Sequence, residues 1–179
     1  IKVDTGAKDL ALNNSEKITE GLDGLRERLQ EYYQLGAKFA KWRSVITISK
    51  DLPSELCIHS NAHALARYAA LCQENDIVPI VEPEVLMDGD HDINRCYEVT
   101  KMTLDRVFKE LVADGVDLKT ICLKPNMVIN GSLSKTKSSP EEIASKTTDC
   151  FQEVVRLHQN RFLKPNWLIV KLYNYLFSL

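Results

Sequence analysis

Apolar residues recur along one side of three stretches of the chain, which predicts three helices, and a helix-start signature predicts a fourth. The stretches cover residues 14–35, 54–75 and about 92–113, and the fourth begins at residues 139–142. The fourth opens with serine, proline and two glutamates, which are favoured at a helix N-terminus. Gly36 ends the first stretch and provides a helix stop. The apolar positions of that first stretch are Ile18, Leu22, Leu25, Leu29 and Tyr32.

Short apolar runs lie between these stretches and predict β-strands. They cover residues 37–42, 77–81 and 120–123, and residues 1–3 resemble the end of an earlier strand. Strands that alternate with helices favour a parallel sheet. Two prolines within residues 77–84 weaken the strand pattern there, because each removes a backbone donor.

A charged residue lies near the end of each predicted strand, and the spacing is nearly even. The steps from Lys2 to Lys41, to Glu82, to Lys124 and to Lys164 are 39, 41, 42 and 40 residues. Each step is long enough for a strand-helix crossover, and the steps share no sequence motif. They therefore indicate successive β/α units, whose chemistry usually lies at the strand ends.

Each of four strand ends carries a second polar residue two positions later, and such residues share a face of a strand. The pairs are Lys2 with Asp4, Lys41 with Arg43, Glu82 with Glu84, and Lys124 with Asn126. At one barrel mouth they would suit an anionic substrate and proton transfer at a carbonyl. A lysine that is desolvated beside other cations can supply the neutral amine of a Schiff base. The alternative is that each charge is an ordinary solvated strand end.

Composition narrows the function classes. The 179 residues suffice for one domain or for part of a larger one. With 23 basic and 25 acidic residues, the net charge of −2 gives no field that would attract nucleic acid or an anionic membrane. The five cysteines form no C-x-x-C pair, which indicates reduced thiols in a cytosolic protein. Because the first residue is Ile1 and not Met, we expect an internal fragment.

Two patterns resemble metal sites only superficially. The acidic stretch at residues 88–92 begins like a calcium loop, but Ile93 and Val99 replace the required glycine and glutamate. We expect its aspartates to cap the following helix. His59 and His63 have the spacing of a zinc pair without an H-E-x-x-H context, so we expect ordinary surface or packing histidines and no metal.

Five stretches in collinear order carry a resemblance to a known family. They are KVDTG, GLDGLRERLQEYYQLGAKFAKWR, NAHALARYAALCQENDIVPIVEPE, DGDHD and LKPNMV. Together they are similar to the class I fructose-bisphosphate aldolases, metal-independent Schiff-base enzymes. The resemblance implies an α/β fold, a (β/α)8 TIM barrel of which this chain is a central fragment. It covers residues 1–155, the central part of a single barrel, whereas residues 156–179 form an atypical C-terminal segment that does not resemble the family.

The resemblance implies that Lys124 forms the Schiff base with the ketose carbonyl. Glu82 would transfer protons, with Glu84 as its hydrogen-bonding neighbour. A protonated imine is an electron sink, so the carbon-carbon bond can break without a metal. A carboxylate is still needed to move protons at the cleaved hydroxyl.

The resemblance also assigns the other cations and the activity. Lys41 would contact substrate near the reacting centre and Arg43 would face a phosphate, while Lys2 matches a further active-site lysine. The implied reaction is reversible cleavage of fructose 1,6-bisphosphate to dihydroxyacetone phosphate and glyceraldehyde 3-phosphate, in glycolysis and gluconeogenesis and without a cofactor. The implied setting is a cytoplasmic homo-oligomer, a tetramer in this family, that binds a phosphorylated sugar but no nucleic acid or membrane.

Departures from the family keep alternatives open. No glycine follows Gly131, so the family's glycine-rich phosphate loop is missing, and so are its first strands. A non-catalytic aldolase-derived fragment that acts as a binding or oligomerisation module is therefore the alternative. Another Schiff-base aldolase or a transaldolase fits the residues around Glu82 less well. We read the second Leu-Lys-Pro-Asn, at Lys164, as coincidence. An open half-barrel exposes sheet edges, so we expect the isolated chain to be poorly soluble or molten.

Overall fold

Parallel strands and helices alternate over most of the protein. A computed structural model describes residues 1–13 and 15–162. The elements are β1 (Gly6–Asp9), β2 (Lys17–Glu20), α1 (Leu25–Gln34), β3 (Phe39–Ile46), α2 (Glu55–Glu74), β4 (Val78–Val85), α3 (Ile93–Ala113), a 3₁₀ turn (Leu118–Thr120), β5 (Cys122–Leu123) and α4 (Pro140–Phe162).

The predicted strands pair side by side in chain order. β3, β4 and β5 form a parallel sheet, and the N-terminal residues join its free edge through a parallel bridge between Lys2 and Lys41. There Lys41 donates its backbone N–H to the Ile1 carbonyl at 2.8 Å, and Val3 donates to the Lys41 carbonyl at 3.0 Å. The chain thus contributes four consecutive parallel strand segments, as the spacing of the charged residues predicted.

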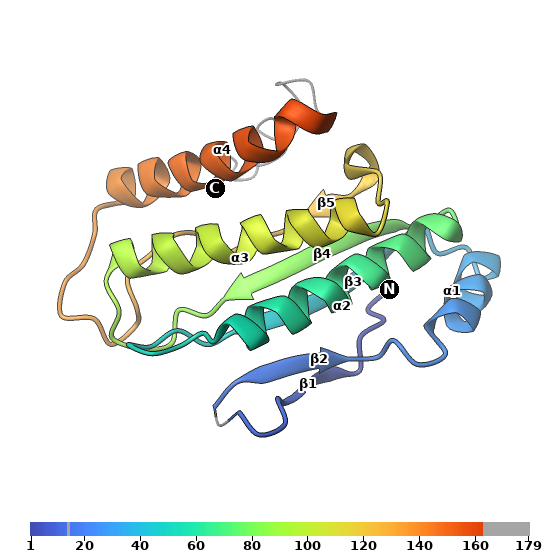
Figure 1. The fold of residues 1–179 in the computed structure, drawn as a ribbon, viewed down its shortest axis with the longest axis horizontal. Coiled ribbons are helices and arrows are strands. Elements are labelled where there is room, and N and C mark those ends of the chain that lie inside the picture. The colour runs from blue at the N-terminus through green and yellow to red at the C-terminus, as the bar shows by residue number, and fades with distance from the viewer. Residues whose placement is uncertain (14, 163–179) are drawn as a thin grey trace.

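The two faces of this sheet differ in polarity and in cover. Along β3 the buried residues are Ala40, Trp42, Ser44 and Ile46, and they alternate with partly or fully exposed ones. Helices α2 and α3 pack along the buried side, as Figure 1 shows. Lys41 and Arg43 point to the opposite, open side. One strand therefore supplies both the core and the polar face.

A tyrosine fixes α2 to the two central strands. The Tyr68 hydroxyl donates to the carbonyls of Ala40 at 2.6 Å and of Ile80 at 3.3 Å. Its ring stacks on Trp42 with 5.5 Å between the centroids, and both side chains are fully buried. Burial raises the Tyr68 pKa far above its usual range, so the hydroxyl remains a donor. The hydrogen bond to Ala40 fixes the β3 backbone directly before Lys41.

The helix predicted for residues 14–35 is wrong in its first half. Only Leu25–Gln34 is helical, and β1 and β2 form an antiparallel hairpin before it. Tertiary contacts decide this difference, because the Glu16 carboxylate is buried and accepts hydrogen bonds from the Ser54 backbone N–H at 2.7 Å and hydroxyl at 2.5 Å. Gly21 then separates the hairpin from α1 with a φ of +130°, a conformation that glycine adopts readily.

The helix termini follow the sequence signals. Asp92 caps α3 by accepting a hydrogen bond from Arg95 N–H at 2.8 Å, as expected for the acidic stretch before it. The Ser139 hydroxyl accepts from Glu142 N–H at 3.2 Å at the start of α4, and Gly36 follows the end of α1. Over the part of the chain that the structure describes, no helix has the length and apolar character needed to cross a bilayer.

The predicted reduced thiols are all free. Four of them are buried, and Cys122 is partly exposed. Burial raises the pKa values of Cys57, Cys72 and Cys150 to about 12, so these groups stay as neutral thiols near neutral pH. They pack as small apolar side chains.

Candidate active site

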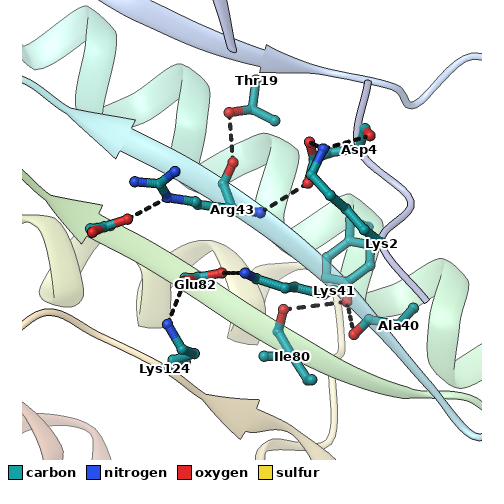
Figure 2. Close-up of polar contacts among 11 residues, drawn as sticks. Lys2, Asp4, Thr19, Ala40, Lys41, Arg43, Ile80, Glu82 and Lys124 are labelled. Atoms are coloured by element: carbon teal, nitrogen blue, oxygen red, sulfur yellow. Dashed lines mark hydrogen bonds and ion pairs between the residues drawn. The ribbon is translucent and has the colours of Figure 1, made fainter. Parts of the chain in front are cut away.

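Glu82 is the centre of a charged cluster on the open face of the sheet. Its Oε1 lies 2.6 Å from the Nζ of Lys124, and its Oε2 lies 2.8 Å from the Nζ of Lys41. The Glu82 side chain is only 4% exposed, whereas those of Lys41 and Lys124 are 37% and 57% exposed. Figure 2 shows the carboxylate between the two ammonium groups, which come from neighbouring strands on either side.

The burial of Glu82 explains why two cations surround it. An ionised carboxylate is costly to remove from water unless opposite charges and hydrogen-bond donors compensate it. Lys124 donates a hydrogen bond to Oε1, and Lys41 forms an ion pair with Oε2. The arrangement places a carboxylate within proton-transfer distance of a lysine nitrogen.

Arg43 and Glu84 form a second ion pair, between β3 and β4. In the parallel register Arg43 lies beside Glu82, but its Nε donates to the carboxylate of Glu84. The resemblance implied that Glu84 would hydrogen-bond to Glu82, and the structure instead pairs it with Arg43. Electrostatics account for this, since two neighbouring carboxylates are each better placed against a separate cation.

Lys2 and Asp4 form a third pair at the edge of the sheet. The Nζ of Lys2 lies 2.6 Å from the Asp4 Oδ1, and the Asp4 side chain is only 2% exposed. Asp4 also accepts hydrogen bonds from the backbone N–H groups of Gly6 at 3.0 Å and of Arg43 at 3.3 Å. Asp4 thus fixes the N-terminal segment to β3. The sequence paired Asp4 with Lys2 by spacing but did not predict this role.

The β1–β2 hairpin contributes to the site, which the sequence did not indicate. The Thr19 hydroxyl donates to the Arg43 carbonyl at 2.8 Å, next to the Arg43–Glu84 pair. A helix was predicted over this stretch, so no contact with β3 could be expected. The adjacent β-branched residues Ile18 and Thr19 were the available signal for a strand.

The six site residues predicted from the sequence lie on one face, but within the described part of the chain they do not form a closed pocket. Over residues 1–13 and 15–162, nothing covers Lys124 enough to desolvate it, and 57% of its side chain is exposed. The dry environment that was expected for this lysine is therefore not provided by the described part of the chain. Four strand segments are too few to close a barrel around it.

The two sequence patterns that resemble metal sites, at residues 88–92 and at His59 and His63, do not form a metal site in the described part of the chain. Within the described residues, no group of three or more His, Cys, Asp or Glu is arranged to hold an ion. His59 and His63 instead lie 3.5 Å and 3.2 Å from the carboxylate of Glu110 on α3. Lys164, in the second Leu-Lys-Pro-Asn, lies outside the described residues.

Comparison with known proteins identifies the family. The family model described as "Glycolytic: Fructose-bisphosphate aldolase class-I" matches residues 1–157. The chain belongs to the class-I fructose-bisphosphate aldolase family. This membership confirms the resemblance seen in the sequence, and the parallel strand segments are accordingly part of an α/β barrel.

Individual class-I aldolases match most of the chain. A "Probable fructose-bisphosphate aldolase class 1" of Xanthomonas campestris is 58% identical over 155 residues, which are 87% of this chain and 46% of the relative. "Fructose-bisphosphate aldolase 4, cytosolic" of Arabidopsis thaliana is 53% identical over 87% of this chain and 39% of its own length. The chain therefore spans about half the length of the curated aldolases that it matches.

A solved aldolase structure has the same fold over this segment. The fructose-bisphosphate aldolase of Plasmodium falciparum, solved in complex with TRAP and a small molecule inhibitor, superposes with a TM-score of 0.84 and is 47% identical. The match covers 86% of this chain and 45% of that one.

Proposed function

We propose that this chain carries the Schiff-base centre of a fructose-bisphosphate aldolase, with Lys124 as the imine-forming residue. The observation that supports this most directly is the carboxylate of Glu82, which lies 2.6 Å from the Lys124 Nζ and 2.8 Å from the Lys41 Nζ. Schiff-base cleavage needs a lysine nitrogen and a proton-transferring group within hydrogen-bond distance of each other. Family membership supplies the substrate class, a phosphorylated ketose.

The proposed reaction begins at the ketose carbonyl. Glu82 takes a proton from the ammonium group of Lys124, and the resulting neutral amine adds to this carbonyl carbon. Glu82 then returns the proton to the former carbonyl oxygen, which leaves as water, and a protonated imine remains. The imine carbon is C2 of the sugar. The bond between C3 and C4 then breaks, and its electron pair moves into the imine to form an enamine. The aldehyde product is glyceraldehyde 3-phosphate.

Glu82 supplies the proton transfers that this sequence requires. The hydroxyl on C4 must lose its proton as the aldehyde forms, and the Glu82 carboxylate is the base that we assign to it. The enamine carbon then takes up a proton, and hydrolysis of the imine releases dihydroxyacetone phosphate and regenerates Lys124. The 4% exposure of the Glu82 side chain limits competition from water for that proton.

The remaining charges fit the binding of an anionic substrate. Lys41 shares Glu82 with Lys124, so it lies beside the proposed reacting centre. Arg43 and Lys2 lie on the same face of the sheet. Lys2 forms an ion pair with Asp4, and Arg43 forms one with Glu84. We propose that Arg43 exchanges this partner for a substrate phosphate, because a planar guanidinium matches phosphate oxygens well.

Several broader features remain proposals that rest on the family. A homo-oligomer of tetramer type and a cytoplasmic location follow from the resemblance, and one Arabidopsis relative is named cytosolic. A boundary near residue 155 between the barrel segment and an atypical C-terminal segment is likewise proposed. Helix α4 continues through that boundary to Phe162.

The test uses a protein that supplies the rest of the barrel, because this chain spans about half of its relatives. In this chimera, called the completed barrel, the matching 155 residues replace their counterparts in the Xanthomonas campestris relative. It should cleave fructose 1,6-bisphosphate, and Lys124→Ala should abolish cleavage whereas Lys119→Ala should not. Lys119 lies in the nearby 3₁₀ turn and is exposed. Activity that survives Lys124→Ala, or that a metal chelator removes, would contradict the proposal.

A further inference from the structure

Strands β4 and β5 stop pairing where Lys124 and Glu82 lie. The register joins Ile80 with Cys122 and Val81 with Leu123, and the last ladder bond runs from the Lys124 N–H to the Val81 carbonyl at 2.8 Å. The next residue on this side is Pro125, and Pro83 follows Glu82 on the other strand. Because Val81 faces β5, the next backbone donor toward β5 would come from position 83, and Pro83 has no N–H to donate. The backbone ladder between the two strands is therefore interrupted here.

The side chain of Asn126 rejoins the strands beyond this interruption. Its Oδ1 accepts a hydrogen bond from the Val85 N–H, at the end of β4, at 3.0 Å. Its Nδ2 donates to the Thr100 hydroxyl of α3 at 3.0 Å and to the Met127 carbonyl at 3.0 Å. Thr100 is only 1% exposed, a polar residue within the apolar stripe of α3. One amide group therefore connects β4, the segment after β5, and the helix behind them.

We infer that Asn126 is a positioning residue, which holds Lys124 against Glu82 by replacing the missing ladder bond. The two site residues lie between two fixed points, the backbone bond of Lys124 on one side and the Asn126–Val85 bond on the other. Without the second point, two proline-interrupted segments are free to separate there. The 2.6 Å contact between the Lys124 Nζ and the Glu82 carboxylate depends on their separation.

This role predicts a specific kinetic effect, and it rests on the proposed function of Lys124. Asn126→Ala removes the contacts to Val85 and Thr100, so turnover in the completed barrel should fall by roughly tenfold to a hundredfold. A displacement of about 1 Å at a reacting centre has an effect of that size. The KM should change little, because the substrate-binding cations are not held by Asn126. Asn126→Asp keeps an oxygen for Val85 and should recover most of the turnover.

A second measurement tests the hydrogen bond between Asn126 and the Val85 N–H, called the tether, and does not depend on catalysis. Hydrogen exchange of the Val85 amide should become about fivefold to tenfold faster in Asn126→Ala, which corresponds to the loss of one hydrogen bond. The Leu86 amide is the internal reference, because it donates to the Ile46 carbonyl at 2.9 Å and not to Asn126. Asn94→Ala is the matched control, since Asn94 is exposed on α3 and, among the described residues, its side chain hydrogen-bonds only with Lys146.

The two measurements separate this inference from the proposed function. If the unmodified completed barrel does not cleave substrate, the proposed function fails, and the Val85 exchange still tests the tether. Unchanged Val85 exchange in Asn126→Ala would overturn the inference whatever the activity. Faster exchange with full turnover would overturn it as well, because Asn126 would then be structural only. An equal loss of turnover in Asn94→Ala would point to general destabilisation and would also count against it.

Discussion

At the scale of single residues, Glu82 connects the sequence to the proposed chemistry. The spacing of charged strand ends selected Glu82, Lys41 and Lys124 without any structure, because parallel strand ends meet at one edge. The sequence could not show which of the charged side chains form ion pairs. The pair of Arg43 and Glu84 is an example, because only the geometry of β3 and β4 brings the Glu84 carboxylate to the Arg43 guanidinium.

Replacing Glu82 by glutamine tests its role in proton transfer. Glutamine keeps the size and a hydrogen-bond acceptor but cannot take up a proton at neutral pH. In the completed barrel, Glu82→Gln should retain ketose binding and lower turnover by roughly a hundredfold or more, the usual scale for loss of general acid-base catalysis.

A steady-state assay with an equilibrium binding measurement separates these two effects. The matched control is Glu98→Gln, because Glu98 is largely exposed and pairs with Arg95 on α3. Unchanged turnover in Glu82→Gln would remove this residue from the mechanism.

At the scale of elements, local sequence signals predicted the strands of the parallel sheet and three of the four helices, and they failed at the hairpin. Helices α2 and α3 have apolar stripes that match their observed burial, and the caps at Asp92 and Ser139, the second of which predicted α4, were readable. Residues 17–20 form a strand because the hairpin is anchored to α2, which lies far away in sequence. A local pattern of apolar residues does not contain that information.

The Glu16 anchor gives a prediction at this scale. Glu16→Ala leaves the Ser54 N–H and hydroxyl without their buried partner, so the free energy of unfolding should fall by about 1–3 kcal/mol. Urea denaturation of the completed barrel measures this change. Glu20→Ala is the control, because Glu20 is on the same hairpin but is exposed. Equal losses in the two variants would mean that Glu16 is not a specific anchor.

At the scale of the whole molecule, the spacing of charged residues predicted the order of the parallel strands, and family membership identified the barrel. The even spacing of Lys2, Lys41, Glu82 and Lys124 matches the observed order of the four strand segments. The open face is consistent with a chain that spans about half the length of the aldolases that it matches. It exposes apolar groups as well as charges, since Phe39 is 55% and Val78 is 43% exposed.

These exposed groups support the prediction that the 179-residue chain by itself is poorly soluble or molten. Among the described residues, both edges of the parallel sheet lack a neighbouring strand, and exposed sheet edges and apolar side chains favour association or loose packing. The chain alone should bind a hydrophobic dye and lack near-ultraviolet circular dichroism, while the completed barrel should melt cooperatively. A sharp cooperative melt of the monomeric chain would contradict this expectation.

Covalent trapping on the completed barrel tests whether Lys124 forms the imine. Dihydroxyacetone phosphate followed by borohydride should reduce an imine irreversibly, and peptide mapping should find the added mass on Lys124. Lys2 and Lys41 serve as internal controls, because they lie on the same face and are also paired with carboxylates. We expect label on Lys124 alone; it should be lost in Lys124→Ala and should be unaffected by a metal chelator. Label on Lys2 or Lys41, or no label at all, would contradict the assignment of Lys124 as the imine-forming residue.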